Sequence, residues 1–100
     1  MNDLYAWVAG RHHGLRTFKA FQQKLESLST DEPDQRGLCK VLGSVVGRYV
    51  EALDEQPVPV ELADHAHQRL LELLASLDLR ANADRRLADI NRVAASDLLR

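Results

Sequence analysis

The chain has one cysteine, three prolines, five glycines and five aromatic residues among its 100 residues. The single cysteine, Cys39, excludes an internal disulfide and fits a reducing compartment. No apolar run approaches the roughly 20 residues that a membrane-spanning helix needs. The N-terminal segment MNDLYAWVAGRHHG lacks the basic start and apolar run of a signal peptide. We therefore expect a soluble, cytoplasmic protein.

The composition is that of a small globular protein. Hydrophobic residues make up 45% and charged residues 28%, which is too hydrophobic for a disordered chain of net charge −2. The length suits a single helical domain over residues 1–100 that buries a core without disulfides. Residues 1–25 carry four cations and one acid, whereas residues 26–64 carry nine acids and three cations. The basic part is too weak to mark a nucleic-acid-binding surface on its own.

Turn-forming residues divide the chain at three places. These are residues 29–37 (STDEPDQRG), 54–59 (DEQPVP) and 78–82 (DLRAN). Between them apolar residues recur at helical spacing, and no segment alternates as a strand does. The sequence predicts an all-α fold, an antiparallel bundle of about four helices with a long, kinked first helix. The expected helices cover residues 3–28, 37–54, 59–78 and 82–99.

The later predicted helices differ in the width of their apolar faces. The helix at 59–78 has a wide face, which fits a helix packed on two sides, either in the centre of the fold or at a dimer interface. In the helix at 37–54, Gly43 and Gly47 lie one turn apart at the edge of the apolar face, where they allow another backbone to approach. Each glycine costs about 1 kcal/mol of helix propensity relative to alanine, so we expect packing to compensate. The helix at 82–99 has a narrow apolar stripe of Leu87, Ile90, Ala94 and Leu98, with Arg85 and Asp89 paired on a solvated face.

Histidines and the cysteine are the candidate metal ligands and catalytic groups. His65 and His67, two residues apart on a helix, point about 160° away from each other and cannot share a zinc ion. Asp64 and His67 have the spacing found in di-iron bundles, but the chain has no second such pair, and we expect neither a metal nor another cofactor. His67 is expected to be partly buried with a hydrogen-bond partner. Cys39 is expected to be a small buried residue, although a helix N-terminus beside Lys40 would lower its pKa.

The segment Gly10–Gly14 (GRHHG) interrupts the first predicted helix. If that helix is continuous, Arg11 falls in the middle of its apolar stripe, where an unpaired charge is costly. Either the helix breaks here and frees Arg11, or Arg11 reaches an acid on a partner. Because the stripe resumes in phase on both sides, the sequence favours a long helix with a bend, with His12 and His13 on its surface. The weaker alternative is an anion bound by Arg11 and free N–H groups at a break.

Four of the five aromatic residues lie within the first 21 residues. Trp, Tyr and Arg are the residue types enriched at interface hot spots. We expect a non-catalytic protein-interaction module, such as a small regulator, adaptor or secretion-type chaperone. We expect it to act as a homodimer, because the first and third predicted helices offer more apolar face than 100 residues need. The expected contact residues are Tyr5, Trp7, Arg11, Phe18 and Phe21.

Two other functions are compatible with the sequence. A small enzyme or ligand binder would use a bundle cavity near His67 and Cys39, although the chain contains no recognised catalytic motif. A nucleic-acid-associated protein would use the basic side of the first helix, where binding would weaken steeply with salt. The residues on that side are His12, His13, Arg16, Lys19 and Lys24. The charge balance disfavours a nucleic-acid partner, and no membrane partner is expected.

Overall fold

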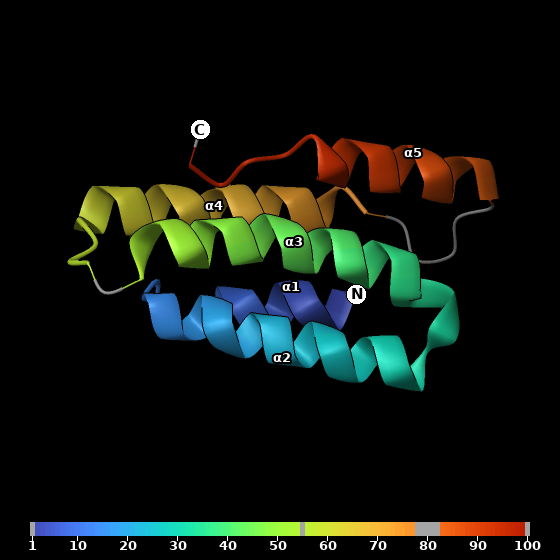
Figure 1. Ribbon diagram of the computed structural model, residues 1–100, viewed down its shortest axis with the longest axis horizontal. Helices are drawn as coiled ribbons and strands as arrows, with labels where there is room; N and C mark the ends of the chain where they lie inside the picture. Colours follow the sequence, from blue (N-terminus) through green and yellow to red (C-terminus); the bar gives the residue numbers. More distant parts are fainter. Residues whose placement is uncertain (1, 55, 78–82, 100) are drawn as a thin grey trace.

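The computed structural model describes residues 2–54, 56–77 and 83–99, and in these ranges all regular secondary structure is helical (Figure 1). The helices are α1 (Asn2–Ala9), α2 (Leu15–Asp31), α3 (Arg36–Leu53), α4 (Val60–Ala75) and α5 (Ala83–Ala94), with a 3₁₀ turn at Pro33–Gln35. The all-α expectation is confirmed, with five helices in these ranges rather than about four. The expected break at 78–82 lies outside the described residues.

The prediction of one long first helix is wrong, because α1 and α2 are separate helices that run in opposite directions (Figure 1). In the last turn of α1, the Gly10 N–H donates to the Ala6 carbonyl at 3.2 Å and the Arg11 N–H to the Val8 carbonyl at 3.1 Å. The next helix starts only after Gly14, whose carbonyl accepts the Thr17 N–H at 3.1 Å. Glycine at both ends of the segment weakens the helix here, and the reversal moves Arg11 out of the apolar stripe.

The remaining helix ends follow from local sequence. The Glu32 N–H bonds to the Leu28 carbonyl at 2.8 Å, and Pro33 then starts the 3₁₀ turn that leads into α3. Pro59 precedes α4 and its carbonyl accepts the Ala63 N–H at 3.0 Å, which is the arrangement expected where a proline opens a helix. The predicted helices at 37–54 and 59–78 are therefore present as α3 and α4, with slightly different ends.

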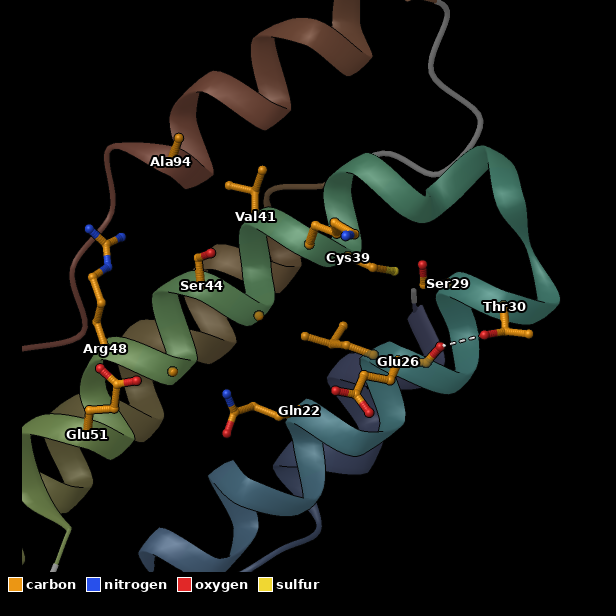
Figure 2. A pocket seen from close by; sticks show the side chains of 14 residues that line it. Gln22, Glu26, Ser29, Thr30, Cys39, Val41, Ser44, Arg48, Glu51 and Ala94 are labelled. Atoms are coloured by element: carbon orange, nitrogen blue, oxygen red, sulfur yellow. Dashed lines mark hydrogen bonds between the residues drawn. The ribbon is translucent and has the colours of Figure 1, made fainter.

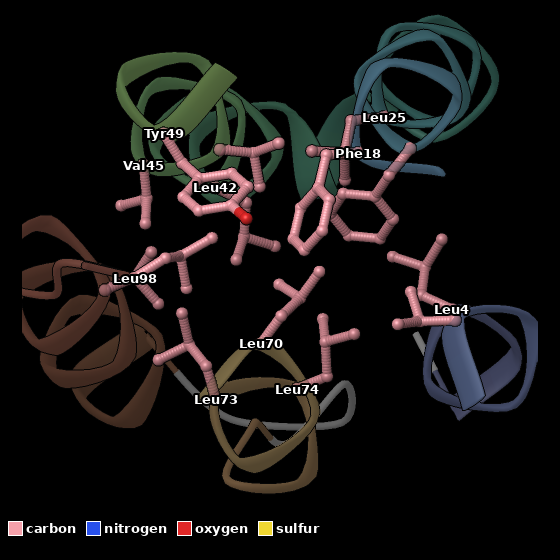
Figure 3. Close-up of a cluster of buried hydrophobic side chains, with 14 of the residues drawn as sticks. Leu4, Phe18, Leu25, Leu42, Val45, Tyr49, Leu70, Leu73, Leu74 and Leu98 are labelled. Carbon is pink, nitrogen blue, oxygen red and sulfur yellow. The ribbon is translucent and has the colours of Figure 1, made fainter. Parts of the chain in front are cut away.

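The helices surround one core. α2 packs along α3, α3 packs against α5, and α1 packs against α4. Figure 3 shows labelled side chains of α1, α2, α3 and α4, together with Leu98 from the segment after α5, pointing into the same space. The Phe18 and Tyr49 rings lie 4.6 Å apart. The largest fully buried side chains include Val8, Phe18, Phe21, Leu38, Leu42, Val46, Tyr49, Leu70 and Val93.

The wide apolar face predicted for residues 59–78 is covered within the chain. Leu70 and Leu74 of α4 are buried, as are Leu4 and Val8 of α1, which packs against α4. Over the described residues, these apolar side chains of the first and third predicted helices therefore pack within the chain instead of forming a surface for a second copy. The reversal at Gly10–Gly14 explains this, because it brings the start of the chain back over α4 instead of extending it beyond the bundle.

The predicted apolar stripe of α5 is wrong in part. Leu87 is 59% exposed, whereas Asp89, expected on a solvated face, is completely buried. Arg85 Nε and Arg92 Nη2 each donate to Asp89 Oδ1 at 2.9 Å, so the buried carboxylate is compensated by two cations. Both arginines also donate to the Ser76 carbonyl at 3.0 Å, where cations favourably meet the C-terminal end of α4. This network therefore ties α5 to α4.

Candidate functional site

His13 connects the Gly10–Gly14 turn to α4. Its Nδ1–H donates to Asp64 Oδ1 at 2.6 Å, and its ring stacks on that of His67 with centroids 3.8 Å apart and planes 19° apart. His67 is 4% exposed, and its Nε2–H donates to the Val8 carbonyl at 3.0 Å. The end of α1, the turn and α4 therefore meet at these two histidines.

The environment of His67 favours its neutral form. Burial lowers the pKa of His67 below its ordinary value of 6.5, and the nearby His13 acts in the same direction. The bond to the Val8 carbonyl and the carboxylate of Asp64 oppose this shift without cancelling it. The expected hydrogen-bond partner of His67 is confirmed, whereas the side chain is more deeply buried than the partial burial expected. Its role here is to hold the backbone of α1.

His12 folds over the turn and explains the glycine at position 14. Its Nδ1 accepts the Gly14 N–H at 3.0 Å, and a Cβ at Gly14 would lie 2.9 Å from the same nitrogen. The Thr17 hydroxyl lies 3.4 Å from both ring nitrogens of His12. Because the Gly14 N–H already donates to His12, it is not free to bind an anion. This removes one N–H group from the anion site that the sequence offered as an alternative at this break.

Trp7, Arg11 and Lys24 form a group that we call the Trp7 cluster. The Arg11 guanidinium lies 4.4 Å from the centroid of the Trp7 ring and the Lys24 ammonium 5.7 Å from it, both within cation–π range. The ring is half-buried and also contacts Phe21, with centroids 6.3 Å apart. Among the described residues, neither cation forms an ion pair with an acidic side chain. The cluster therefore joins an aromatic ring to two uncompensated cations.

The structure separates the five residues expected to contact a partner. Phe18 and Phe21 are 1% and 0% exposed, so they belong to the core of this structure. Tyr5 is 41% exposed but lies two residues from Trp7, so the two rings project from opposite sides of α1. Of the expected set, only Trp7 and Arg11 are in contact with each other at the surface.

The basic side expected for the alternative nucleic-acid function is also divided. His13 pairs with Asp64, and the Lys19 ammonium lies 3.1 Å from Asp54 Oδ1. His12 turns toward Gly14, and Lys24 lies against Trp7. The remaining member, Arg16, is exposed. These residues therefore do not face a single ligand together.

Cys39 and His67 do not share a cavity among the described residues. Cys39 lies near the start of α3, at the α2–α3 end of the molecule, whereas His67 lies beside the α1–α2 turn at the opposite end (Figure 1). Cys39 is buried as expected, and burial raises the pKa of its thiol, with Glu32 acting in the same direction. Arg86 acts in the opposite direction without cancelling the rise, so the thiol is kept in its less nucleophilic form.

A groove runs along the outer side of α2 and α3. Its volume is about 1090 Å³, and Gly43, Ser44 and Gly47 of α3 are among its lining residues. Figure 2 shows Gln22 and Glu26 of α2 across the groove from α3. The sequence placed the two glycines at the edge of the apolar face of this helix, and in the structure both line the groove. The groove itself depends on which helix packs beside α3, which helical spacing does not specify.

Within the described ranges, no three His, Cys, Asp or Glu side chains are grouped so that they could hold a metal ion. None of the helices in these ranges combines the length and the apolar character needed to cross a membrane. Comparison of the chain with protein-family models, curated proteins and solved structures finds no match. The geometry of the described surfaces is therefore the basis for a functional proposal.

Proposed function

We propose that this protein is a non-catalytic helical protein-interaction module that binds an acidic segment of a partner protein through the Trp7 cluster. The observation that carries the proposal is the pairing of a half-buried Trp7 ring with Arg11 and Lys24, whose charges meet no acid among the described residues. Trp and Arg are the residue types that most often supply binding energy at protein interfaces.

The position of the cluster supports docking rather than a structural role alone. Trp7 belongs to α1 and Lys24 to α2, while Arg11 lies in the turn between them, so the chain reversal assembles the cluster. A carboxylate placed over the two cations would gain charge-assisted hydrogen bonds, which are stronger than neutral ones. The half-buried indole offers apolar contact beside them, which suits an acidic segment that also carries apolar side chains.

The test uses a display library of random twelve-residue peptides, because the proposal specifies the chemistry of the partner rather than its identity. We expect acidic peptides with apolar residues to be enriched on the wild-type protein. Trp7 is the only tryptophan in the chain, so its fluorescence reports on binding of the enriched peptides. Arg11→Glu/Lys24→Glu should weaken that binding by about tenfold or more, because rim charges become repulsive.

A matched control is available elsewhere on the surface. Arg36→Glu/Arg69→Glu changes the net charge equally, at exposed residues of α3 and α4, and should leave peptide affinity nearly unchanged. Charge reversal is preferred to Trp7→Ala, because Trp7 also contacts Phe21 and its loss would reduce stability. If the peptides enriched on the wild-type protein are not acidic, or if both double variants bind the enriched peptides equally well, the Trp7 cluster is not the docking surface.

A further inference from the structure

The outer face of α3 carries a charge pattern that the fold leaves uncompensated. Lys40, Ser44, Gly47 and Glu51 are separated by four, three and four residues and therefore lie on one side of the helix. All four line the groove along α2 and α3. Lys40 and Glu51 are exposed at its two ends, and among the described residues neither forms an ion pair.

The middle of this face carries only small residues, so another backbone can approach it. A Cβ at Gly43 would meet only Leu25 Cδ1 at 4.0 Å, an ordinary contact, so packing within the chain does not require glycine there. A Cβ at Gly47 would lie 3.0 Å from Gln22 Nε2, the end of a flexible side chain. Figure 2 shows Ser44 between Arg48 and Val41 on the exposed side of α3. Small residues at the centre leave room for another helix, and opposite charges at the two ends can form interhelical ion pairs that set its orientation.

We propose that the occupant of this groove is a second copy of the chain, with α3 packed antiparallel on α3 across a two-fold axis between Ser44 and Gly47. The axis sets Ser44 opposite Gly47 of the partner subunit. It also sets Lys40 opposite Glu51 of the partner subunit, and symmetry repeats this pair at the other end. Lys40 and Glu51 are equally far in sequence from the midpoint, which an isologous contact requires.

The antiparallel alignment of the two α3 helices also leaves room for Arg48, the largest side chain beside this contact. Arg48 lies opposite Gly43 of the partner subunit, which has no side chain to obstruct it. Among the described residues of one chain, Arg48 makes only a long bond of 3.4 Å to the Ser96 carbonyl, so it can reorient at little cost. The spacing of four and three residues keeps the contact positions on one side of α3, as in a coiled coil, although this stripe is polar rather than apolar. This surface is separate from the Trp7 cluster, and the proposal does not depend on the proposed function.

The experiment is sedimentation equilibrium of the full chain over a range of concentrations. The wild-type protein should show a reversible dimer. Lys40→Glu and Glu51→Lys each turn both terminal pairs into like charges, and each should weaken dimerisation by about tenfold or more. The double variant Lys40→Glu/Glu51→Lys restores opposite charges with the positions exchanged and should dimerise like the wild type.

Mixing the two single variants gives the sharpest result. A heterodimer of the Lys40→Glu chain with the Glu51→Lys chain has two attractive pairs, so an equimolar mixture should dimerise although neither variant alone does so well. Arg69→Glu and Glu61→Lys, which make the same charge changes on the exposed surface of α4, serve as controls and should leave dimerisation unchanged. Circular dichroism of every variant confirms that the helices are retained.

Two results would overturn the proposal. If the wild-type protein stays monomeric at every concentration, a second copy of the chain does not occupy the groove. This result would leave the proposal for the Trp7 cluster unchanged, because that surface is separate. A dimer that the two single substitutions do not weaken, or that the double variant and the mixture do not restore, would place the dimer contact on another surface.

Discussion

The rings of His13 and His67 stack with their centroids 3.8 Å apart, although 53 positions separate them in the sequence. This contact joins the turn after α1 to the middle of α4. Its neighbours Asp64 and the Val8 carbonyl accept hydrogen bonds from the two rings, one from each. The pair therefore shows directly that the start of the chain folds back over the bundle.

Stability should fall when the solution is acidified below about pH 6.5. The pKa of His67 is lowered in the folded protein, chiefly by burial. Below 6.5 the unfolded chain therefore binds more protons than the folded one, and unfolding becomes easier until the lowered pKa is reached. The slope from this one group is at most about 1.4 kcal/mol per pH unit. Urea unfolding at several pH values measures it.

His67→Gln is the matched control for this pH dependence. The glutamine amide can still donate to the Val8 carbonyl but does not titrate. The difference in stability between the wild type and this variant should therefore change between pH 7 and pH 5, with the wild type losing more. A difference that stays constant over that range would contradict the assignment.

The ion pair between His13 and Asp64 should contribute little despite its short distance. Their side chains are 44% and 56% exposed, so water screens the pair, and such exposed pairs are worth about 0–1 kcal/mol. A double-mutant cycle with His13→Ala and Asp64→Asn, measured by urea unfolding, should give a coupling energy in that range. A coupling well above about 1 kcal/mol would mean that the pair is shielded more than its exposure indicates.

Phe21→Ala should destabilise the fold by about 3–5 kcal/mol, because a completely buried ring is replaced by a cavity. Tyr5→Ala, at the exposed ring on α1, should cost much less. Thermal unfolding of the two variants compares them directly. Similar losses for both would contradict the placement of Phe21 in the core and of Tyr5 at the surface.

Asp89→Asn should destabilise the protein by about 1–3 kcal/mol, because it removes the buried charge that Arg85 and Arg92 share. The control is Asp84→Asn, at an exposed residue in the first turn of α5, where the expected loss is only about 0.3–1 kcal/mol from the helix dipole. Chemical unfolding monitored by circular dichroism measures both. Equal effects would show that Asp89 is solvated, as its charge pattern alone suggested.

The sequence predicts most of the helices but not the reversal of the chain. Prolines and turn residues mark the ends of α3 and α4 because their effects are local. The apolar stripe of α1 continues in phase into α2, so periodicity alone cannot distinguish one bent helix from two antiparallel ones. Arg11, which a continuous helix would place in the apolar seam, argues against such a helix, but an acid on a partner would satisfy it equally well. The packing of α1 against α4 depends on contacts between residues that are far apart in the sequence. The spacing of apolar residues within a helix gives no information about such contacts.

The candidate surfaces were accessible to sequence reasoning to different degrees. The types of Trp7 and Arg11 marked them as contact residues, and the structure shows them in contact. Lys24 joins them only because α2 runs back along α1, so nothing local could assign it to that cluster. Phe18 and Phe21 carry the same aromatic signal but are buried, because residue type does not reveal which side of a helix faces the core. The burial of Asp89 in α5 could not be predicted either, because an acidic residue is normally exposed. It is buried here because its partners Arg85 and Arg92 compensate its charge.

The chain reversal at Gly10–Gly14 assembles the Trp7 cluster, and nuclear Overhauser effects in solution test this reversal most directly. The stacked rings predict strong cross-peaks between the ring protons of His13 and His67, and between His67 and Val8. Amide and α-proton contacts typical of a helix should stop after Ala9 and resume at Leu15. Helical contacts running without interruption from Trp7 to Phe18, with no cross-peak between the two histidines, would contradict the fold described above.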